Sequence, residues 1–329
     1  MTTGFWNKLK KPIFVLAPMA DVTDAAFRHI IAKYGKPDVM WTEFVSADGL
    51  ALAPEAGRKK LLKDLEYSEA ERPIVAQFFT SSPEHMKGAA ELTAKLGFDG
   101  VDINMGCPDK SVEKQGAGAS LMRNVSLARE LVKAAKEGAP NLPISVKTRI
   151  GYGKPDLENW LPEILKEDLA IVTVHARTRK EMSKVSAQWE FVRRAVEIRD
   201  LSGKATLIFG NGDVLDIDDA KRKCKEFGCD GVMLGRAIFG NPFLFSEKKC
   251  PEGIEGLKLR LEVLVEHAKL FEELLLGYKN FAIMKKHFKA YVSDFTGANE
   301  LRARLMDTNN VNEVEAAVND FLLYYSHEK

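Results

Sequence analysis

The sequence predicts an α/β fold, a (β/α)8 TIM barrel followed by a small C-terminal helical domain. Eight short apolar runs alternate with longer amphipathic stretches between residues 13 and 236. An open doubly wound sheet has fewer strands and normally a GxGxxG in its first turn, which this sequence lacks. After residue 248 the strand signal ends. We therefore expect a barrel at 1–248 and a helical domain at 249–329.

The eight runs have the composition of strands, because they are short, rich in β-branched or aromatic residues and bounded by turn formers. The stretches between them carry helix signals. In SPEHMKGAAELTAKLG, for example, Ser82 is expected to cap the helix, Pro83 to open it and Gly97 to end it. The runs are IFVLAPM from Ile13, VMWTEFV from Val39, PIVAQFF from Pro73, GVDINMG from Gly100, PISVKTR from Pro143, AIVTVHAR from Ala170, ATLIFGNG from Ala205 and GVMLGR from Gly231.

The C-terminal part reads as helical throughout. From Leu257 to Leu275, and again from Phe281 to Phe295, apolar residues recur at helical spacing with no strand pattern. The second stripe leaves Lys285, Lys286 and Lys289 on other faces. Six basic residues stand against two acidic ones between Lys279 and Arg304, which is typical either of a solvated helix face or of a patch that binds nucleic acid.

Composition limits the possible classes of protein. The formal net charge is only +1 and the hydrophobic fraction is 45%, so a large core is expected and an anionic partner would have to meet a local patch. Four cysteines without CxxC spacing indicate neither a disulfide scaffold nor a metal site, and suggest a reducing, cytoplasmic setting. Pro18 and Asp21 interrupt the N-terminal apolar run, so we expect no secretory leader. Elsewhere no run approaches the roughly 18 apolar residues of a membrane span, so none is expected. We also expect a monomer.

Polar residues stand at the ends of six successive runs. In a parallel barrel these carboxyl ends meet at one mouth, where TIM-barrel active sites lie. One lysine or histidine alone would fit a buried ion pair or a core residue, but here six successive strands end in polar residues. The residues, in order, are Asp21 and Asp24, Glu43, Gln77, Asn104 and Cys107, Lys147 and Arg149, and His175 and Arg177.

The last two runs end in glycine-rich turns. IFGNGD ends at Asp213, and VMLGRAIFGNP contains Arg236. These are the loops after strands seven and eight, where barrels commonly hold phosphate, because glycine lets backbone amides approach an anion and arginine offers forked donors. The position of both turns predicts a phosphorylated cofactor.

Together these segments resemble one known family. The chain is similar, in colinear order from about residue 13 to 245, to the tRNA dihydrouridine synthases, and MKKHFKAYVSDFTGANELRARLM resembles that family's RNA-binding domain. One segment departs from it: after HARTR many members carry a tyrosine, a glycine and Ala-Asp-Trp, where this chain has KEMSKVSAQWE. The matching segments are APMADVTDAAFR, AQFF, VDINMGCPDKSVEKQGAGASLM, VKTRIGY, VHARTR, GNGDV and GVMLGRAIFGNP.

The resemblance implies an enzyme that uses FMN and a nicotinamide dinucleotide, NADPH or NADH, to reduce the C5=C6 bond of uridine in tRNA. Cys107 would donate the proton to C5, since a thiol with an ordinary pKa of about 8.5 is mostly protonated at neutral pH. Asn104 would face the target uracil. The remaining tRNA contacts would come from Arg177, Arg179, Lys285, Lys286 and Lys289.

The resemblance also implies a cofactor site. The backbone of Pro18, Met19 and Ala20 would lie against the flavin ring, Gln77 would bond its polar edge, and Lys147 would neutralise the reduced form. His175 would help to hold the cofactor. Around the ribityl phosphate we expect Asn211, Gly212, Asp213, Gly235 and Arg236.

Two other functions are compatible with parts of this pattern. The barrel motifs alone permit an FMN enzyme that reduces a small molecule, against which the basic helical tail argues. A barrel retained as a scaffold for RNA binding, without chemistry, would not need Cys107, Lys147 and His175 together. Bound flavin separates the enzymes from the scaffold, and tRNA-dependent oxidation of that flavin separates the two enzymes.

Overall fold

The computed structural model describes residues 4–248 and 250–327, and it contains the expected barrel. Eight parallel strands form one sheet in the order β1-β8-β7-β6-β5-β4-β3-β2. A parallel bridge between Val15 and Val39 joins its two ends. Seven of the eight strands lie within the predicted runs, and β2 extends one residue beyond its run, to Ser46. Their bounds are β1 Ile13–Leu16, β2 Met40–Ser46, β3 Ile74–Phe79, β4 Gly100–Met105, β5 Ile144–Arg149, β6 Ile171–His175, β7 Leu207–Asn211 and β8 Gly231–Leu234.

One hydrophobic cluster lies inside the strands. Trp6, from the short 3-10 helix η1 (Gly4–Lys8), packs its ring 5.9 Å from that of Trp41 and 6.0 Å from that of Phe209, measured between centroids. Ile13 and Val15 of β1 belong to the same cluster. The barrel interior is therefore filled with side chains away from its carboxyl mouth, which leaves that mouth for polar groups.

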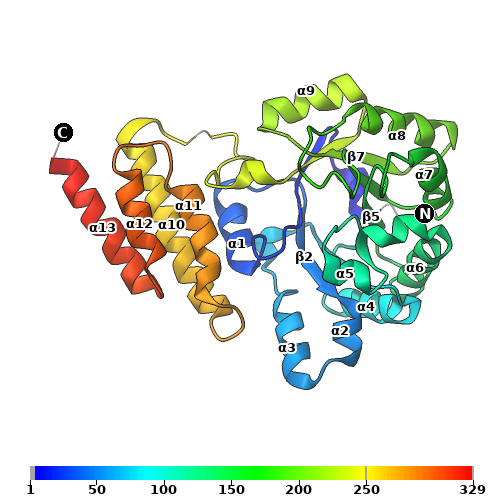
Figure 1. Ribbon diagram of the computed structural model, residues 1–329, viewed down its shortest axis with the longest axis horizontal. Coiled ribbons are helices and arrows are strands. Elements are labelled where there is room, and N and C mark those ends of the chain that lie inside the picture. The colour runs from blue at the N-terminus through cyan, green and yellow to red at the C-terminus, as the bar shows by residue number, and fades with distance from the viewer. Residues whose placement is uncertain (1–3, 249, 328–329) are drawn as a thin grey trace. The chain divides into compact units, whose positions relative to one another are not determined.

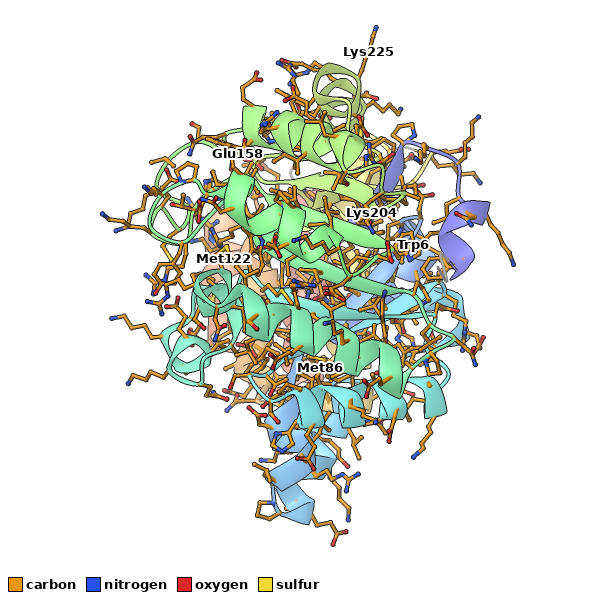
Figure 2. The ribbon with its side chains drawn as sticks, turned by 90° about the vertical axis from the view of Figure 1, so that its right-hand side faces the viewer. Trp6, Met86, Met122, Glu158, Lys204 and Lys225 are labelled. Carbon is orange, nitrogen blue, oxygen red and sulfur yellow. The ribbon has the colours of Figure 1, made fainter. Side chains whose placement is uncertain are left out.

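Helices cover the outside of the sheet, and successive ones pack side by side (Figure 2). The expected helix punctuation is present in α4, where the Ser82 side chain accepts a hydrogen bond from the His85 peptide nitrogen and Pro83 is the first helical residue. Gly97 follows with a positive φ of 79°. The covering helices are α4 Pro83–Lys95, α6 Val125–Gly138, α7 Leu157–Leu165, α8 Glu190–Leu201 and α9 Ile217–Phe227.

Shorter elements occupy the loops that follow the strands. After β2 the chain forms α2 (Ala47–Leu52) and α3 (Glu55–Lys63) in place of one covering helix. After β4 it forms α5 (Lys110–Lys114) and the 3-10 helix η3 (Gly118–Arg123), and after β8 the 3-10 helix η4 (Arg236–Ile238).

The chain divides into two compact units. The barrel unit comprises residues 1–19, 38–65 and 72–236, and the helical unit comprises 20–37, 66–71 and 237–329. In the helical unit, α10 runs antiparallel to α11 and to α13 (Figure 1). The predicted apolar stripe of α10 is buried along its whole length. The bounds are α10 Gly253–Leu275, η5 Phe281–Ile283, α11 Met284–Tyr291, α12 Ala298–Met306 and α13 Val311–His327.

Helix α1 (Ala25–Tyr34), which follows β1 in the sequence, belongs to the helical unit. Ala26 and Ile30 are part of the same buried cluster as the apolar stripe of α10. Phe27 packs its ring 5.3 Å from that of His267 on α10 and 4.9 Å from that of His287 on α11. The core of this unit therefore depends on a segment from near the N-terminus.

Two buried histidines stand out in that core. His267 is 0% and His287 1% exposed, and their ring centroids are 4.6 Å apart. Both ring nitrogens of His267 and Nε2 of His287 lack a hydrogen-bond partner within the described part of the chain. Burial lowers the pKa of His267 well below its ordinary value, and burial with the Lys286 charge lowers the pKa of His287 to about 3. Both rings are therefore neutral at physiological pH.

Across residues 4–248 and 250–327, no helix is both long enough and apolar enough to cross a membrane. The four cysteines are free thiols, with Cys224 and Cys229 buried and their sulfur atoms 3.7 Å apart.

Candidate active site

The structure connects the polar residues of β3 and β4 by hydrogen bonds. Asn104 donates from Nδ2 to Oε1 of Gln77, at 3.0 Å. Its Oδ1 accepts from the backbone nitrogens of Gly106 and Cys107, at 3.1 and 2.8 Å. The loop that carries the thiol is therefore held by a side chain from the strand before it.

Cys107 is partly buried at the start of that loop. Its carbonyl oxygen accepts from the Ala119 nitrogen at 2.9 Å. Gly118 makes this closeness possible, because it has a φ of +61° and a Cβ there would lie 2.8 Å from the same oxygen. Burial raises the pKa of the Cys107 thiol above its ordinary value. The thiol is therefore protonated at neutral pH, as a proton donor must be.

Lys147 of β5 is the cation at the centre of the strand ends. Its ammonium donates to Oδ1 of Asn211 at 3.3 Å, and Asn211 donates to the Met233 carbonyl at 2.7 Å. Burial, with the nearby Arg149 charge, lowers the pKa of Lys147 to about 8. The side chain is thus still mostly protonated at pH 7, so Lys147 carries a positive charge among the strand ends.

His175 at the end of β6 lies among cations. Burial and the positive charges of Lys147 and Arg149 lower its pKa well below the ordinary value. Its Nε2 is 3.2 Å from Nη1 of Arg177, which can only donate. His175 is therefore a neutral imidazole that accepts from Arg177 at Nε2.

The loop after β7 is built around Asp213. This carboxylate accepts from Arg177, from Arg236 at 2.6 Å and from the Ala187 nitrogen at 2.8 Å. The side chain of Arg236 is 66% exposed, so most of its guanidinium remains available to a ligand. Asp213 thus positions two arginines.

Arg177 and Arg179, expected to contact tRNA, both have partners within the barrel unit. Arg177 is 2% exposed and also donates to the Val185 carbonyl at 2.6 Å. Arg179 forms a forked ion pair with Glu113, with Nε 2.9 Å from each carboxylate oxygen. In these positions both arginines tie the loop after β6 to its neighbours. The segment that departs from the family pattern, after HARTR, lies in this loop.

Two charged residues near the site were not assigned a function from the sequence. Asp102 of β4 is 1% exposed and accepts from Gln77 and from Ser145, each at 2.5 Å. Arg149 of β5 donates from Nε to the Gly106 carbonyl at 2.7 Å and from Nη1 to Thr178. Burial lowers the pKa of Arg149 to about 10, so it keeps its charge. Asp102 and Asn104 are two residues apart in β4, so their side chains lie on the same face of the strand. This spacing in the sequence could have indicated that Asp102 belongs to the site.

The strand ends also fit a phosphorylated cofactor. A Cβ added to Gly235 would meet only Ala17 and Met19, each 3.7 Å away, so packing does not explain this glycine and space remains beside Arg236. Gly212 has a φ of +120°, which favours glycine. The positive charges of Lys147, Arg177 and Arg236 all act on His175, at the end of β6. Pro18 and Met19 follow β1 and Ala20 begins the helical unit.

Lys285, Lys286 and Lys289, the residues predicted to form a basic patch, lie on α11 in the helical unit. Lys286 and Lys289 are exposed and Lys285 is half-buried. Lys286 has a carboxylate partner, Asp21, at 3.4 Å. The predicted apolar stripe of this segment, including Met284 and Phe288, is buried, so the lysines lie off the packed face as expected.

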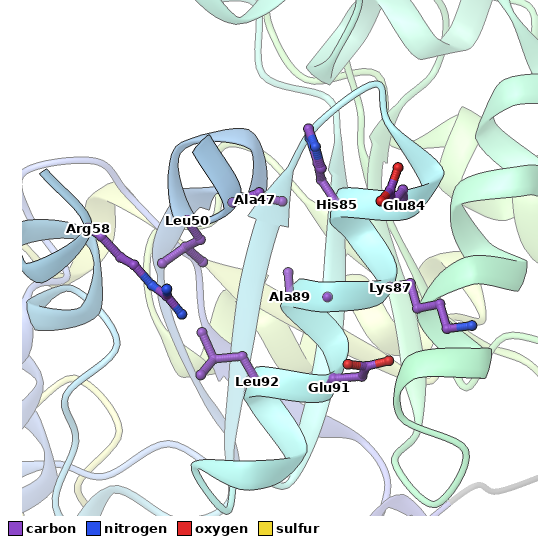
Figure 3. Close-up of a pocket in the computed structure, with 11 residues that line it drawn as sticks. Ala47, Leu50, Arg58, Glu84, His85, Lys87, Ala89, Glu91 and Leu92 are labelled. Atoms are coloured by element: carbon purple, nitrogen blue, oxygen red, sulfur yellow. The ribbon is translucent and has the colours of Figure 1, made fainter. Parts of the chain in front are cut away.

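A groove outside the strands lies between α2, α3 and α4, with a volume of about 420 Å³ (Figure 3). Arg58 and Leu50 lie on one side of it and Leu92 and His85 on the other. Nδ1 of His85 is 2.6 Å from Oδ1 of Asp48. None of the residues expected to act in catalysis or cofactor binding lines this groove.

The gathering of a protonated thiol, a lysine and loop arginines at the carboxyl ends of eight strands defines an enzyme of the TIM-barrel class. The model of the dihydrouridine synthase family (Dus) matches residues 15–324. The chain belongs to this family, as its motifs predicted.

Two bacterial relatives match over almost their whole length. "Probable tRNA-dihydrouridine synthase 2" of Bacillus subtilis (strain 168) is 41% identical over 326 residues, covering 98% of this chain and 97% of the relative. "Probable tRNA-dihydrouridine synthase" of Staphylococcus aureus (strain MRSA252) is 39% identical over 326 residues, covering 98% and 96%. The whole chain is thus comparable with these proteins.

Solved structures of low sequence identity share the barrel. Histamine dehydrogenase from Rhizobium sp. 4-9 matches with a TM-score of 0.53 and 16% identity, over 78% of this chain and 48% of that one. A 2-naphthoyl-CoA reductase complex matches with a TM-score of 0.54 and 10% identity, over 71% and 49%. The chain spans about half the length of each. These likenesses confirm the predicted fold class.

Proposed function

We propose that this protein is a tRNA-dihydrouridine synthase that reduces the C5=C6 bond of uridine in tRNA with a flavin cofactor. The observation that carries the proposal is the position of Cys107, a protonated thiol in the loop just after β4, in a chain that belongs to the dihydrouridine synthase family. Family membership implies the flavin, and FMN in particular is our proposal.

The residues that would hold FMN are those assigned from the motifs. Gln77 and Lys147 would meet the flavin ring, and Asn211, Gly212, Gly235 and Arg236 would surround the phosphate, with Asp213 fixing Arg236. His175 would contribute a neutral ring. When bound and reduced, FMN supplies a hydride to the base. NADPH or NADH would be the source of the electrons.

Cys107 would complete the reduction by donating the Sγ proton to C5. Hydride arrival at C6 leaves negative charge spread over C5 and the C4 carbonyl, which a proton at C5 removes. The raised pKa keeps the proton on sulfur until that charge has formed. A nucleophilic cysteine would need the opposite shift, a lowered pKa. Asn104 would face the base from β4, the strand before the loop that carries the thiol.

The test is reduction of the purified protein without oxygen, followed by mixing with unmodified tRNA. We expect a yellow protein whose reduced flavin is reoxidised by tRNA, with dihydrouridine detected in the RNA. Fully modified tRNA is the matched control and should leave the flavin reduced. Rapid oxidation by a small enone but not by tRNA would instead support the small-molecule reductase, and a protein that takes up no flavin would support the scaffold.

Lys147→Ala is expected to weaken flavin binding or slow flavin reduction, because the reduced ring gains negative charge that this lysine would neutralise. Lys147→Arg keeps a positive charge and should retain most of the binding. Flavin titration measures affinity, and anaerobic reduction by NADPH measures the rate. If wild type and Lys147→Ala have equal flavin affinity and equal rates of flavin reduction, Lys147 is not part of the cofactor site.

Residues 249–329 are proposed as the tRNA-binding domain, with the α11 lysines as a contact. Reversing Lys285, Lys286 and Lys289 to Glu should weaken tRNA binding by about tenfold or more at low salt, and less at high salt, because phosphate contacts release counterions. Flavin binding should not change. Reversing three exposed lysines of the outer barrel helices, Lys95, Lys221 and Lys225, is the control of equal charge. If both triple variants bind tRNA alike, the α11 lysines form only a solvated face.

A further inference from the structure

A chain of hydrogen bonds in the site has a fixed direction. The backbone nitrogens of Gly106 and Cys107 can only donate, so Asn104 must present Oδ1 to them. Its Nδ2 therefore donates to Gln77, which must accept this hydrogen bond through Oε1. Gln77 is then left with Nε2 for its other neighbour, Asp102.

The chain can end only on an acceptor. Asp102 receives Nε2 of Gln77 on one oxygen and the hydroxyl of Ser145 on the other, each at 2.5 Å. Gln77, Asp102 and Asn104 are 0%, 1% and 6% exposed, so water does not substitute for any of these partners. A buried amide left without its partner costs about 1–3 kcal/mol, which is enough to hold both amides in one orientation.

We propose that Asp102 is a positioning residue of the dihydrouridine synthase site, whose buried carboxylate fixes the orientation of the Gln77 and Asn104 amides and, through Asn104, the loop that carries Cys107. Its relevance to catalysis rests on the proposed function. The orientation of the amides is a property of the protein by itself and is measured separately below.

The fixed direction decides what the two amides can offer to a ligand. Each oxygen is engaged within the chain, and each nitrogen has used one of its two hydrogens. One N–H remains on each side chain. Asn104 would accordingly donate to a carbonyl oxygen of the target base, and that bond strengthens as negative charge develops on the oxygen during reduction. Gln77 would likewise meet an acceptor of the cofactor ring.

Asp102 acts in this argument as an acceptor and not as a negative charge. Burial raises the pKa of its carboxyl to about 6, and Lys147 is the charged group that opposes the rise. Asp102→Asn keeps an oxygen for Gln77, and its new N–H can bond Ser145, because the Ser145 hydroxyl can turn to the Val101 carbonyl 3.3 Å away. Asp102→Leu keeps the size and removes the acceptor.

The experiment compares Asp102→Leu, Asp102→Asn and Ser145→Ala with wild type. In protein free of flavin, NMR of side-chain amides labelled with nitrogen-15 should show the Gln77 and Asn104 signals unchanged in Ser145→Ala and nearly so in Asp102→Asn. In Asp102→Leu both should shift or broaden. In single-turnover mixing with tRNA, Asp102→Leu should be slower by roughly ten- to a hundredfold, in line with the cost of small misplacements, and the other two within about threefold of wild type.

Several results would overturn the proposal. Unchanged amide signals in Asp102→Leu would show that Asp102 does not orient them. Equal slowing in Asp102→Leu and Asp102→Asn would assign the effect to lost charge, and equal slowing in Asp102→Leu and Ser145→Ala to general destabilisation. If wild type is not reoxidised by tRNA, the proposed function fails while the NMR comparison still decides the orientation.

A second pair of variants keeps the test decisive if Asp102→Leu does not fold. Gln77→Glu places two carboxylates against each other and should disturb the Asn104 signal. Adding Asp102→Asn restores a donor opposite an acceptor, so the signal should return toward its original position. If neither change alters the Asn104 signal, the chain of hydrogen bonds does not have the proposed direction.

Discussion

Cys107→Ala is expected to bind flavin and to be reduced by the nicotinamide at a near-normal rate, but to be reoxidised by tRNA some 10² to 10⁴ times more slowly. The range is the contribution of positioned general acids in other enzymes. The two half-reactions separate because the thiol has no role until the base carries negative charge. Burial raises the thiol pKa, so the proton is held on sulfur through the first half-reaction.

Single-turnover stopped-flow measures this directly, by following flavin absorbance after mixing reduced enzyme with unmodified tRNA. Cys107→Ser keeps the geometry with a far weaker acid, so it should also be slow. Cys250→Ala removes another partly exposed free thiol and serves as the control. If Cys107→Ala forms dihydrouridine as fast as wild type, the thiol is not the acid.

The helical unit should lose stability as the pH falls below about 6.5. His267 and His287 have pKa values in the folded protein far below the unfolded value of about 6.5. Between these values the unfolded chain binds protons that the folded chain cannot, so stability present above pH 6.5 is lost on acidification. At pH 5 the loss amounts to about 2 kcal/mol for each histidine, or about 4 kcal/mol for the pair.

Hydrogen exchange of α10 and α11 at pH 5 and pH 7.5, corrected for intrinsic rates, measures this loss within the unit. Replacing both residues by Leu should remove most of the difference. His29 is the matched control, because its hydrogen bond to Glu71 raises its pKa and it stabilises the fold below pH 6.5. His29→Gln should therefore reduce stability at pH 5. A pH dependence that persists in the double Leu variant would rule out the buried pair as its source.

The strands could be predicted from the sequence because barrel strands are covered on both faces and so read as nearly continuous apolar runs. Some of the differences at their ends have simple causes. The predicted runs began at Pro73 and Pro143, but the strands begin one residue later, since proline lacks the N–H that a ladder needs. At the other end, the glycine turn of the seventh run lies beyond Asn211.

The site could be predicted only in part. Strand order brings Gln77 beside Asn104, and Lys147 close to Asn211, so residues named from strand ends do meet. Loop partners follow no such rule. The carboxylate of Asp213 lies 36 residues after Arg177 in the sequence, and Glu113 lies 66 before Arg179. No periodicity relates these positions, because each pair joins loops that follow different strands.

Helix α1 limits how the C-terminal helices could be exchanged among proteins. Ala26, Phe27 and Ile30 are 0%, 1% and 0% exposed within the helical unit. A chain cut after residue 248 would open this apolar face to water, where such a surface promotes aggregation. A foreign RNA-binding module grafted at that junction would meet a face shaped for α10. The two parts of the gene can therefore recombine only if the segment encoding α1 is inherited with the helices that cover it.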